Sequence, residues 1–297
     1  MDDYIGYLDF TAQNMAKLAL ELGDYECALE NYIKAKDRLD KYQGDRMLPI
    51  MMAADLSKAI QEMAKKVNEG QRILYKSPWS LTKSSFVKGN QCHKYLYLEI
   101  YNRSEKTPPS KELQEIFNRG ILFEKNVRNS LFQVGVNVKE KVQDFSYFNS
   151  FTIYLLGLPE QKVIFEATII EDLVFVMCDI LVQNEDNTID IYEIKSSTNI
   201  NDAILADLSV QYAICKKRFQ TNLKSFNLVL RKDTADFGFE IINLTEDLDK
   251  KIDTVNDKIN EFKRVLKDSE PQITMGEHCQ KPYECEFKTY CTKNIKN

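Results

Sequence analysis

Two apolar runs on either side of a polar segment in the middle of the chain predict a β-hairpin. Residues 173–197 have the sequence LVFVMCDILVQNEDNTIDIYEIKSS, in which two apolar, β-branched runs flank the polar turn 184–187. Asp179 lies inside the first run, and Glu193 and Lys195 share one face of the second, because alternate side chains of a strand point the same way. Burying a charge is unfavourable unless it pairs or binds a metal, so these residues mark a candidate site.

Similar patterns predict more strands and helices around this hairpin. Apolar runs predict strands near residues 136–142, 162–170, 225–231 and 237–244. Helical spacing predicts helices near residues 81–102, 111–132, 201–219 and 246–267. Helices that flank a mixed central sheet make an α/β fold.

The N-terminal part has a different, helical pattern. Apolar residues recur at helical spacing from residue 8 to about 44, interrupted at Gly23-Asp24, and again over about 49–74. Small alanines between aromatic residues suit closely packed antiparallel helices. We therefore predict a three-helix module over residues 1–75 and a second domain over 79–297, separated near Pro78.

This N-terminal module resembles an MIT domain or a single tetratricopeptide-type hairpin through the segment GDYECAL, residues 23–29, and Tyr32. The resemblance implies a groove that binds a partner helix. A packing module without a partner explains the same residues equally well.

Composition and charge limit the possible partners. The net charge is −5, so a surface for nucleic acid must be local. Residues 71–128 hold 11 Lys and Arg against 5 Asp and Glu, and residues 1–70 hold 9 against 13. The basic residues of the first stretch that would suit a nucleic-acid backbone are Lys83, Lys88, Lys94, Arg119, Lys125 and Arg128, although a solvated helix face would contain them too. The chain has no signal-peptide pattern and no membrane-length apolar run, so we expect a cytoplasmic protein without membrane insertion.

Seven cysteines in such a protein favour metal ligands or free thiols over disulfides. Cys279, Cys285 and Cys291 are evenly spaced near the C-terminus, and Cys92 is the candidate fourth ligand. Thiolates suit Zn²⁺ or an iron–sulfur cluster. The neighbouring histidines, His93 and His278, would favour zinc if either were a ligand, although four cysteines already suffice. Buried free thiols are the prediction for the remaining cysteines, Cys27, Cys178 and Cys215.

Asp179 followed by Glu193-Ile194-Lys195 resembles the metal-dependent PD-(D/E)XK nucleases. The resemblance implies a restriction-endonuclease-like core in which Asp179, Glu193 and the backbone carbonyl of Ile194 hold Mg²⁺ or Mn²⁺. It also implies that Lys195 helps to position or activate water. Hard cations prefer oxygen ligands and neutralise charge on phosphate. A solvated Glu–Lys ion pair explains the short motif alone.

The resemblance is closest to iron–sulfur nucleases of the RecB and CRISPR-associated exonuclease group, which have one cysteine before the nuclease core and three after it. The matching segments are Arg119-Gly120 with Glu124, FEAT at 165–168, Asp179-Ile180-Leu181, YEIKSS at 192–197, Asp207 with Gln211-Tyr212, and the four cysteines. The resemblance implies a [4Fe–4S] cluster on Cys92, Cys279, Cys285 and Cys291. The longer spacing of the last cysteines leaves zinc open.

The chain departs from this group in the residues around the motif. Glu124 stands where many relatives have a histidine and is a possible outer metal ligand. Gln211 is followed directly by Tyr212 rather than by a tyrosine four residues later, and it could contact phosphate or orient Lys195. Glu166 could be a third acid near the metal or a salt-bridge partner.

Together these features predict a Mg²⁺- or Mn²⁺-dependent deoxyribonuclease, expected to be an exonuclease, in DNA repair or anti-phage defence. DNA, as single strands or duplex ends, is the expected partner. The first alternative is a catalytically silent nucleic-acid-binding or scaffold protein. The second is an adaptor whose function lies in the N-terminal helices.

Overall fold

The computed structural model describes residues 2–21, 24–40, 47–68, 80–142, 145, 148–158, 162–233 and 238–293. The chain divides into two compact units, Met1–Ser77 and Pro78–Asn297, and each is described by itself. Among the described residues, no helix is long and apolar enough to cross a membrane.

The first unit consists of helices α1 (Asp2–Glu21), α2 (Tyr25–Asp40) and α3 (Met47–Asn68), so the prediction of N-terminal helices is confirmed. Helix α2 packs against both others. Fully buried alanines, including Ala16 and Ala28, allow the close approach that the sequence predicted. Asp24 starts α2, since its side chain accepts a hydrogen bond from the backbone N–H of Cys27 at 3.0 Å.

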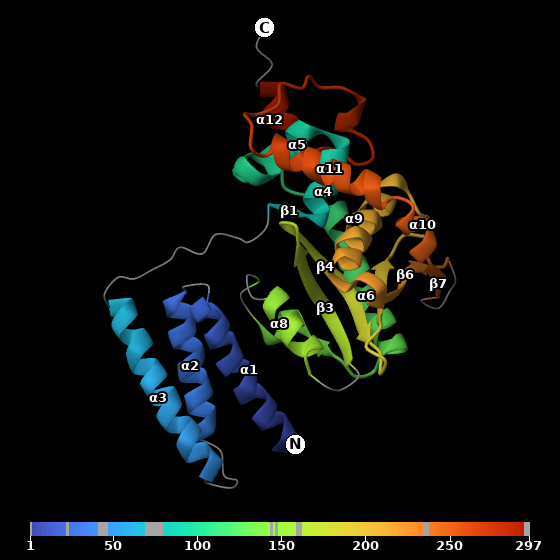
Figure 1. The fold of residues 1–297 in the computed structure, drawn as a ribbon. Coiled ribbons are helices and arrows are strands. Elements are labelled where there is room, and N and C mark those ends of the chain that lie inside the picture. Colours follow the sequence, from blue (N-terminus) through green and yellow to red (C-terminus); the bar gives the residue numbers. More distant parts are fainter. Residues whose placement is uncertain are drawn as a thin grey trace. The chain divides into compact units, whose positions relative to one another are not determined.

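The second unit is built on a mixed seven-stranded sheet (Figure 1). Its strands are β1 (Leu81–Thr82), β2 (Val136–Asn137), β3 (Lys162–Glu171), β4 (Val174–Gln183), β5 (Ile189–Lys195), β6 (Leu223–Arg231) and β7 (Phe239–Asn243). The order is β2-β3-β4-β5-β6-β7, and β1 also pairs with β4. The β3–β4, β4–β5 and β6–β7 pairs are antiparallel, and the other pairs are parallel. The predicted α/β fold with a mixed central sheet is confirmed.

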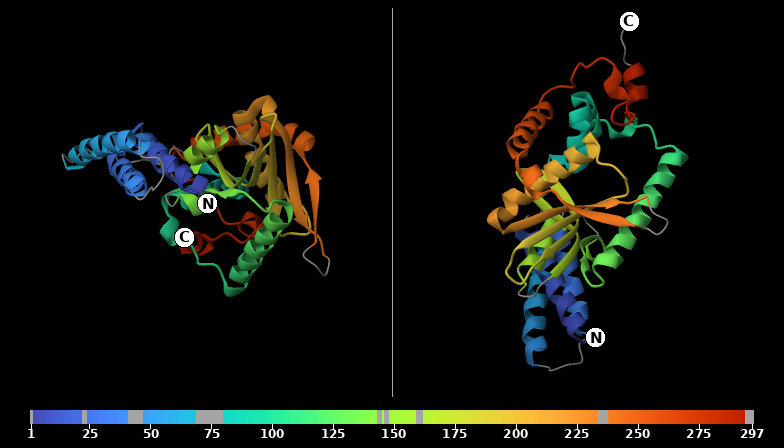
Figure 2. Two further views of the ribbon diagram at one scale, coloured as in Figure 1. Left: turned by 90° about the horizontal axis from the view of Figure 1, so that it is seen from below. Right: turned by 90° about the vertical axis from the view of Figure 1, so that its right-hand side faces the viewer.

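Helices lie on both faces of this sheet and beyond one end of it (Figure 1). The helices of this unit are α4 (Lys83–Gln91), α5 (His93–Tyr101), α6 (Lys111–Leu131), α7 (Val138–Lys141), α8 (Phe148–Leu156), α9 (Asp202–Phe219), α10 (Thr245–Asp249), α11 (Ile252–Val265) and α12 (Lys288–Lys293). Helix α6 packs Phe123 and Val127 onto a cluster that includes Ile180 and Ile194. Helix α9 packs against β3, β4 and β6 and also against α4 and α11. Figure 2 shows α6 and α9 on opposite sides of the sheet.

Three sequence predictions are wrong in detail. The strand expected at 136–142 ends after Asn137, because Val138 and Val142 are buried four residues apart and suit the helical turn α7. The helix expected over 81–102 is the short strand β1 followed by α4 and α5, which separate at Cys92 in an extended conformation. The helix expected over 246–267 divides into α10 and α11 at Lys250 and Lys251.

Candidate functional site

The site forms where strands β4 and β5 diverge. Their backbone pairing ends at Ile180 and Tyr192. Beyond that point the carboxylate of Asp179 accepts a hydrogen bond from the backbone N–H of Ile194 at 2.7 Å. Pairing of β4 with β3 is interrupted at the same level, where Glu166 has a positive φ of 57°. The side chain of Asp179 therefore takes the place of a backbone hydrogen bond between β4 and β5.

Glu193 is the most buried acid of the site, with 2% of its surface exposed. One carboxylate oxygen, Oε1, accepts hydrogen bonds from the ammonium groups of Lys195 at 2.8 Å and Lys83 at 2.7 Å. The other oxygen, Oε2, is buried and has no hydrogen-bond partner. A buried carboxylate oxygen without a protein partner is costly, so this atom is available to bind a ligand.

Helix α9 supplies two further polar side chains, one helical turn apart, to the same cluster. Asp207 accepts a hydrogen bond from Lys195 at 2.7 Å. Gln211 is fully buried and accepts one from Lys83 at 2.5 Å. Gln211 thus contacts Lys83 rather than Lys195, which the sequence offered as its partner.

The carboxyl groups of the site influence one another. Burial, together with the neighbouring charges of Glu193 and Glu124, raises the pKa of Asp179 well above its ordinary value. Burial also opposes ionisation of Glu193, but Lys195 and Lys83 outweigh it and lower the pKa of Glu193 to about 2. The two lysines therefore keep Glu193 charged. For Asp179, the nearby positive charges do not offset the effect of burial.

Glu124 and Glu166 lie beside this cluster but have cationic partners of their own. Arg128, one turn after Glu124 on α6, forms ion pairs with Glu124 and with Glu166, the latter at 2.5 Å. Lys139 also pairs with Glu166, at 2.6 Å. Glu166 is therefore a salt-bridge residue. Burial, and then the charges of Glu166 and Glu193, raise the pKa of Glu124, although Arg128 opposes this rise.

The donor set fits a hard divalent cation, although its side chains are arranged around lysines. Asp179, the unpartnered oxygen of Glu193 and the nearby Glu124 supply carboxylate oxygens, which are the ligands that Mg²⁺ and Mn²⁺ prefer. A cation would also offset the burial that raises the pKa of Asp179. Within the described residues, no three His, Cys, Asp or Glu side chains already converge on one ion position. Binding would therefore require rotation of these carboxylates.

Replacing Asp179 by Asn should stabilise the metal-free protein at neutral pH. Because the folded-state pKa lies above the ordinary value of 3.8, deprotonation of Asp179 opposes folding at higher pH. Asn keeps an acceptor for the Ile194 N–H, and we expect a higher free energy of unfolding at neutral pH. Urea denaturation in EDTA at pH 7.5 and pH 3.5 measures this, and the gain should vanish at the lower pH. An Asp179→Asn protein less stable at pH 7.5 would contradict this account.

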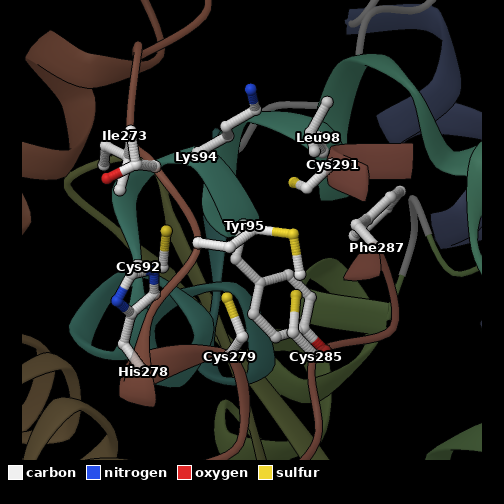
Figure 3. Close-up of a pocket in the computed structure, with 12 residues that line it drawn as sticks. Cys92, Lys94, Tyr95, Leu98, Ile273, His278, Cys279, Cys285, Phe287 and Cys291 are labelled. Atoms are coloured by element: carbon white, nitrogen blue, oxygen red, sulfur yellow. The ribbon is translucent and has the colours of Figure 1, made fainter. Parts of the chain in front are cut away.

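The four predicted cysteine ligands line a single cavity. Figure 3 shows Cys92, Cys279, Cys285 and Cys291 on its wall, with Tyr95 and Phe287 beside them. Cys92 comes from the break between α4 and α5, and the others come from the C-terminal segment. Two segments almost 190 residues apart in the sequence meet here. The side chain of Gln91, for example, donates a hydrogen bond to the backbone carbonyl of His278.

The thiol set fits a thiophilic metal group by its chemistry. Burial, and then the three neighbouring thiols, raise the pKa of Cys285 to about 11, although a backbone hydrogen bond from Phe287 opposes this rise. Thiolates packed together in this way need a cation to offset their charge. The cavity has a volume of about 20 Å³, close to that of one water molecule, so the cysteine side chains must turn to hold either zinc or a cluster.

The two candidate histidines differ in position. His278 lines the cysteine cavity. His93 instead lies 3.4 Å from Glu261 and packs its ring against Phe262. Of the remaining cysteines, Cys178 and Cys215 are fully buried as predicted, with their sulfur atoms 3.7 Å apart, whereas Cys27 is only partly buried.

A cleft of about 320 Å³ opens beside the carboxylate site. Lys195 and Asp207 line this cleft, and so do Tyr283 and Tyr95, the latter of which also lines the cysteine cavity. Apolar residues of α4 and α9, such as Val87 and Ile204, form much of the lining. The cleft thus connects the charged cluster with the C-terminal segment.

Sequence reasoning did not assign a site role to Lys83 or Asp207. Lys83 appeared as one member of a basic stretch, and Asp207 appeared as part of a matching segment. The available signal was that Asp207 and Gln211 are spaced four apart, which places them on one helix face. Two other residues of the basic stretch form ion pairs away from this cluster. Lys88 pairs with Glu99, and Lys94 pairs with Glu270.

Comparisons with known proteins do not identify a family. No family model matches the chain. No curated protein matches it significantly. A solved structure described as the crystal structure of SSO0001 covers 80% of this chain and 98% of its own, at 13% sequence identity and a TM-score of 0.36. A similarity at this TM-score carries no argument about function.

Proposed function

We propose that the protein is a Mg²⁺- or Mn²⁺-dependent DNA nuclease that hydrolyses phosphodiester bonds. The observation that carries the proposal is the buried, unpartnered Oε2 of Glu193, next to Asp179, whose pKa is raised. Lysines hold the opposite oxygen of Glu193, so the carboxylate has one cationic side and one open side. Such an arrangement suits a cation and an anionic substrate meeting at one point.

Each residue has a distinct role in this reaction. Asp179, Glu193 and the backbone carbonyl of Ile194 would hold the cation, with Glu124 as an outer ligand. When bound, the cation supplies activation of water and neutralisation of charge on the phosphate. The ammonium of Lys195 contributes a fixed positive charge, because Glu193 and Asp207, despite burial, raise its pKa well above the ordinary value. Lys195 therefore orients water and phosphate rather than removing a proton.

We propose that Cys92, Cys279, Cys285 and Cys291 hold a [4Fe–4S] cluster, with zinc as the alternative. Two observations support this. The four thiols line a common cavity, and the pKa values of two of them, Cys285 and Cys291, are raised. The group would join the C-terminal segment to the break between α4 and α5. Its role would be structural, because Cys92 ends α4, the helix that packs against α9.

The cleft beside Lys195 is the proposed path of the DNA strand. Its apolar walls and tyrosines suit nucleotide bases, while the lysines at its end suit the backbone. An exonuclease in DNA repair or anti-phage defence, acting in the cytoplasm, is the function we propose. For the N-terminal unit, which has its own buried core, we propose a separate role in binding a partner helix.

The proposal is tested by the response of Mn²⁺ binding and of DNA cleavage to Glu193→Gln. Gln has the same shape but no charge, so Mn²⁺ affinity should fall at least about 10-fold and cleavage should be lost. Glu185→Gln, in the exposed turn between β4 and β5, is the matched control and should behave as wild type. Wild-type affinity and cleavage in the Glu193→Gln protein would refute the proposed site.

A further inference from the structure

Lys83 occupies a fixed position at the start of α4. The preceding residue, Thr82, caps the helix through its side chain, which accepts a hydrogen bond from the backbone N–H of Ser85 at 3.1 Å. Ser85 returns the contact to the Thr82 N–H at 2.7 Å, which completes a capping box. The backbone of Thr82 is also held in the sheet, where it pairs with Phe175 of β4. The helix cap and the pairing with β4 therefore both hold the backbone next to Lys83 in place.

The ammonium of Lys83 connects two buried side chains from different elements. It donates to Oε1 of Glu193 on β5 at 2.7 Å and to Oε1 of Gln211 on α9 at 2.5 Å. It lies 3.6 Å from Asp207, one turn earlier on the same helix. The Lys83 side chain is itself 16% exposed, so little water competes for these hydrogen bonds.

This geometry fixes the opposite ends of both partners. An ammonium group only donates, so the oxygen of the Gln211 amide must face Lys83 and its nitrogen must face away. That nitrogen, Nε2, is buried and has no hydrogen-bond partner, and neither has Oε2 of Glu193. The site therefore presents one unsatisfied donor and one unsatisfied acceptor, and Lys83 contacts the opposite end of both side chains, sharing Glu193 with Lys195.

A divalent cation and a phosphate oxygen together satisfy these two atoms. A carboxylate oxygen binds the cation, and an amide N–H donates to an anionic oxygen. We infer that Lys83 is a positioning residue, which turns Glu193 Oε2 to the cation and Gln211 Nε2 to a non-bridging oxygen of the phosphodiester. This inference rests on the proposed nuclease function and assigns Lys83 a role that differs from that of Lys195.

Lys83 does not act as a general base. Burial opposes its charge, but Asp207 and Glu193 outweigh this and raise its pKa above the ordinary value of 10.5. The group therefore stays an ammonium throughout the working pH range and cannot accept a proton from water. Its contribution is orientation of its two partners, together with a constant positive charge.

The test compares Lys83→Met and Lys83→Arg with Lys263→Met in the full-length protein. Lys263 on α11 is a matched control, because its side chain is 15% exposed and forms an ion pair with Asp172 at 2.6 Å. Neither residue belongs to the site. For each protein we would measure kcat and KM for DNA cleavage in Mn²⁺, Mn²⁺ affinity by calorimetry without DNA, and Tm.

Lys83→Met should lower kcat about 100-fold, in the range seen when an orienting or electrostatic group is removed. Its Mn²⁺ affinity should stay within a few-fold of wild type, because Lys195 still holds Oε1 of Glu193 and loss of the competing Lys83 charge offsets the lost contact. Lys83→Arg should recover at least about 10-fold of the lost kcat, since a guanidinium can donate to both partners. Lys263→Met should keep wild-type kcat.

Two results would overturn the inference. A Lys83→Met protein with wild-type kcat would show that Lys83 orients nothing that catalysis needs. A Lys83→Met protein that loses kcat, Mn²⁺ affinity and Tm together, with no recovery in Lys83→Arg, would show a purely structural role. Failure of the nuclease proposal is distinguishable from both, because the wild-type protein itself would then cleave no DNA.

Discussion

Replacing Lys195 by Met is expected to lower DNA cleavage by about 10³-fold, within the range for removal of a positioned catalytic group. Lys195 contacts both Glu193 and Asp207, and it lines the cleft proposed for the DNA strand. Met fills a similar volume but has no charge for the phosphate. Steady-state cleavage of end-labelled DNA in Mn²⁺ measures the effect.

Lys217→Met is the control for this experiment. Lys217 lies on α9 but pairs with Asp172, away from the carboxylate site. The control should cleave at the wild-type rate, and the Lys195→Met protein should remain folded, because Lys83 still neutralises Glu193. Cleavage by Lys195→Met within a few-fold of wild type would remove Lys195 from the mechanism.

Replacing Cys279 by Ala is expected to lower stability and cleavage together. Loss of a metal group that binds the folded state should cost about 3 kcal/mol or more, which corresponds to a Tm lower by roughly 6–12 °C for a domain of this size. Cleavage should fall as well, because Cys92 ends the helix that begins at Lys83. Iron, sulfide and zinc analysis, visible absorbance and thermal unfolding measure the change and distinguish a cluster from zinc.

Cys27→Ala, in α2 of the N-terminal unit, is the matched control and should keep the wild-type metal content. A Cys279→Ala protein with unchanged metal content and Tm would show that these thiols hold no metal group. Loss of metal without loss of cleavage would show that α4 keeps its position unaided.

The hairpin and its acids were predictable because their signals are local. Two apolar, β-branched runs around a polar turn indicated the two strands, and the spacing of Glu193 and Lys195 placed both on one face. The break at Cys92 was not predictable, since the apolar pattern continues through it into α5. Helix α8 was also missed, because a short apolar segment such as residues 148–156 does not distinguish strand from helix.

The position of Lys83 depends on contacts that the sequence pattern does not contain. Its approach to Glu193 requires β1 to pair with β4, which lies more than 90 residues later in the chain. A lysine in a polar segment ordinarily indicates a solvated surface. Likewise, nothing in the apolar run of β4 indicated that this strand separates from β5 at Asp179. There the Asp179 carboxylate accepts a hydrogen bond from the backbone N–H of Ile194.

The most direct test of the central claim is cleavage of DNA by the anaerobically purified wild-type protein. End-labelled single-stranded and double-stranded DNA would each be incubated with Mn²⁺, Mg²⁺ or EDTA. The account predicts cleavage that requires the metal and stops in EDTA, and the labelled products would show which strand form and which end are used. A folded protein of full metal content at its cysteines that cleaves neither DNA with either cation would contradict the account.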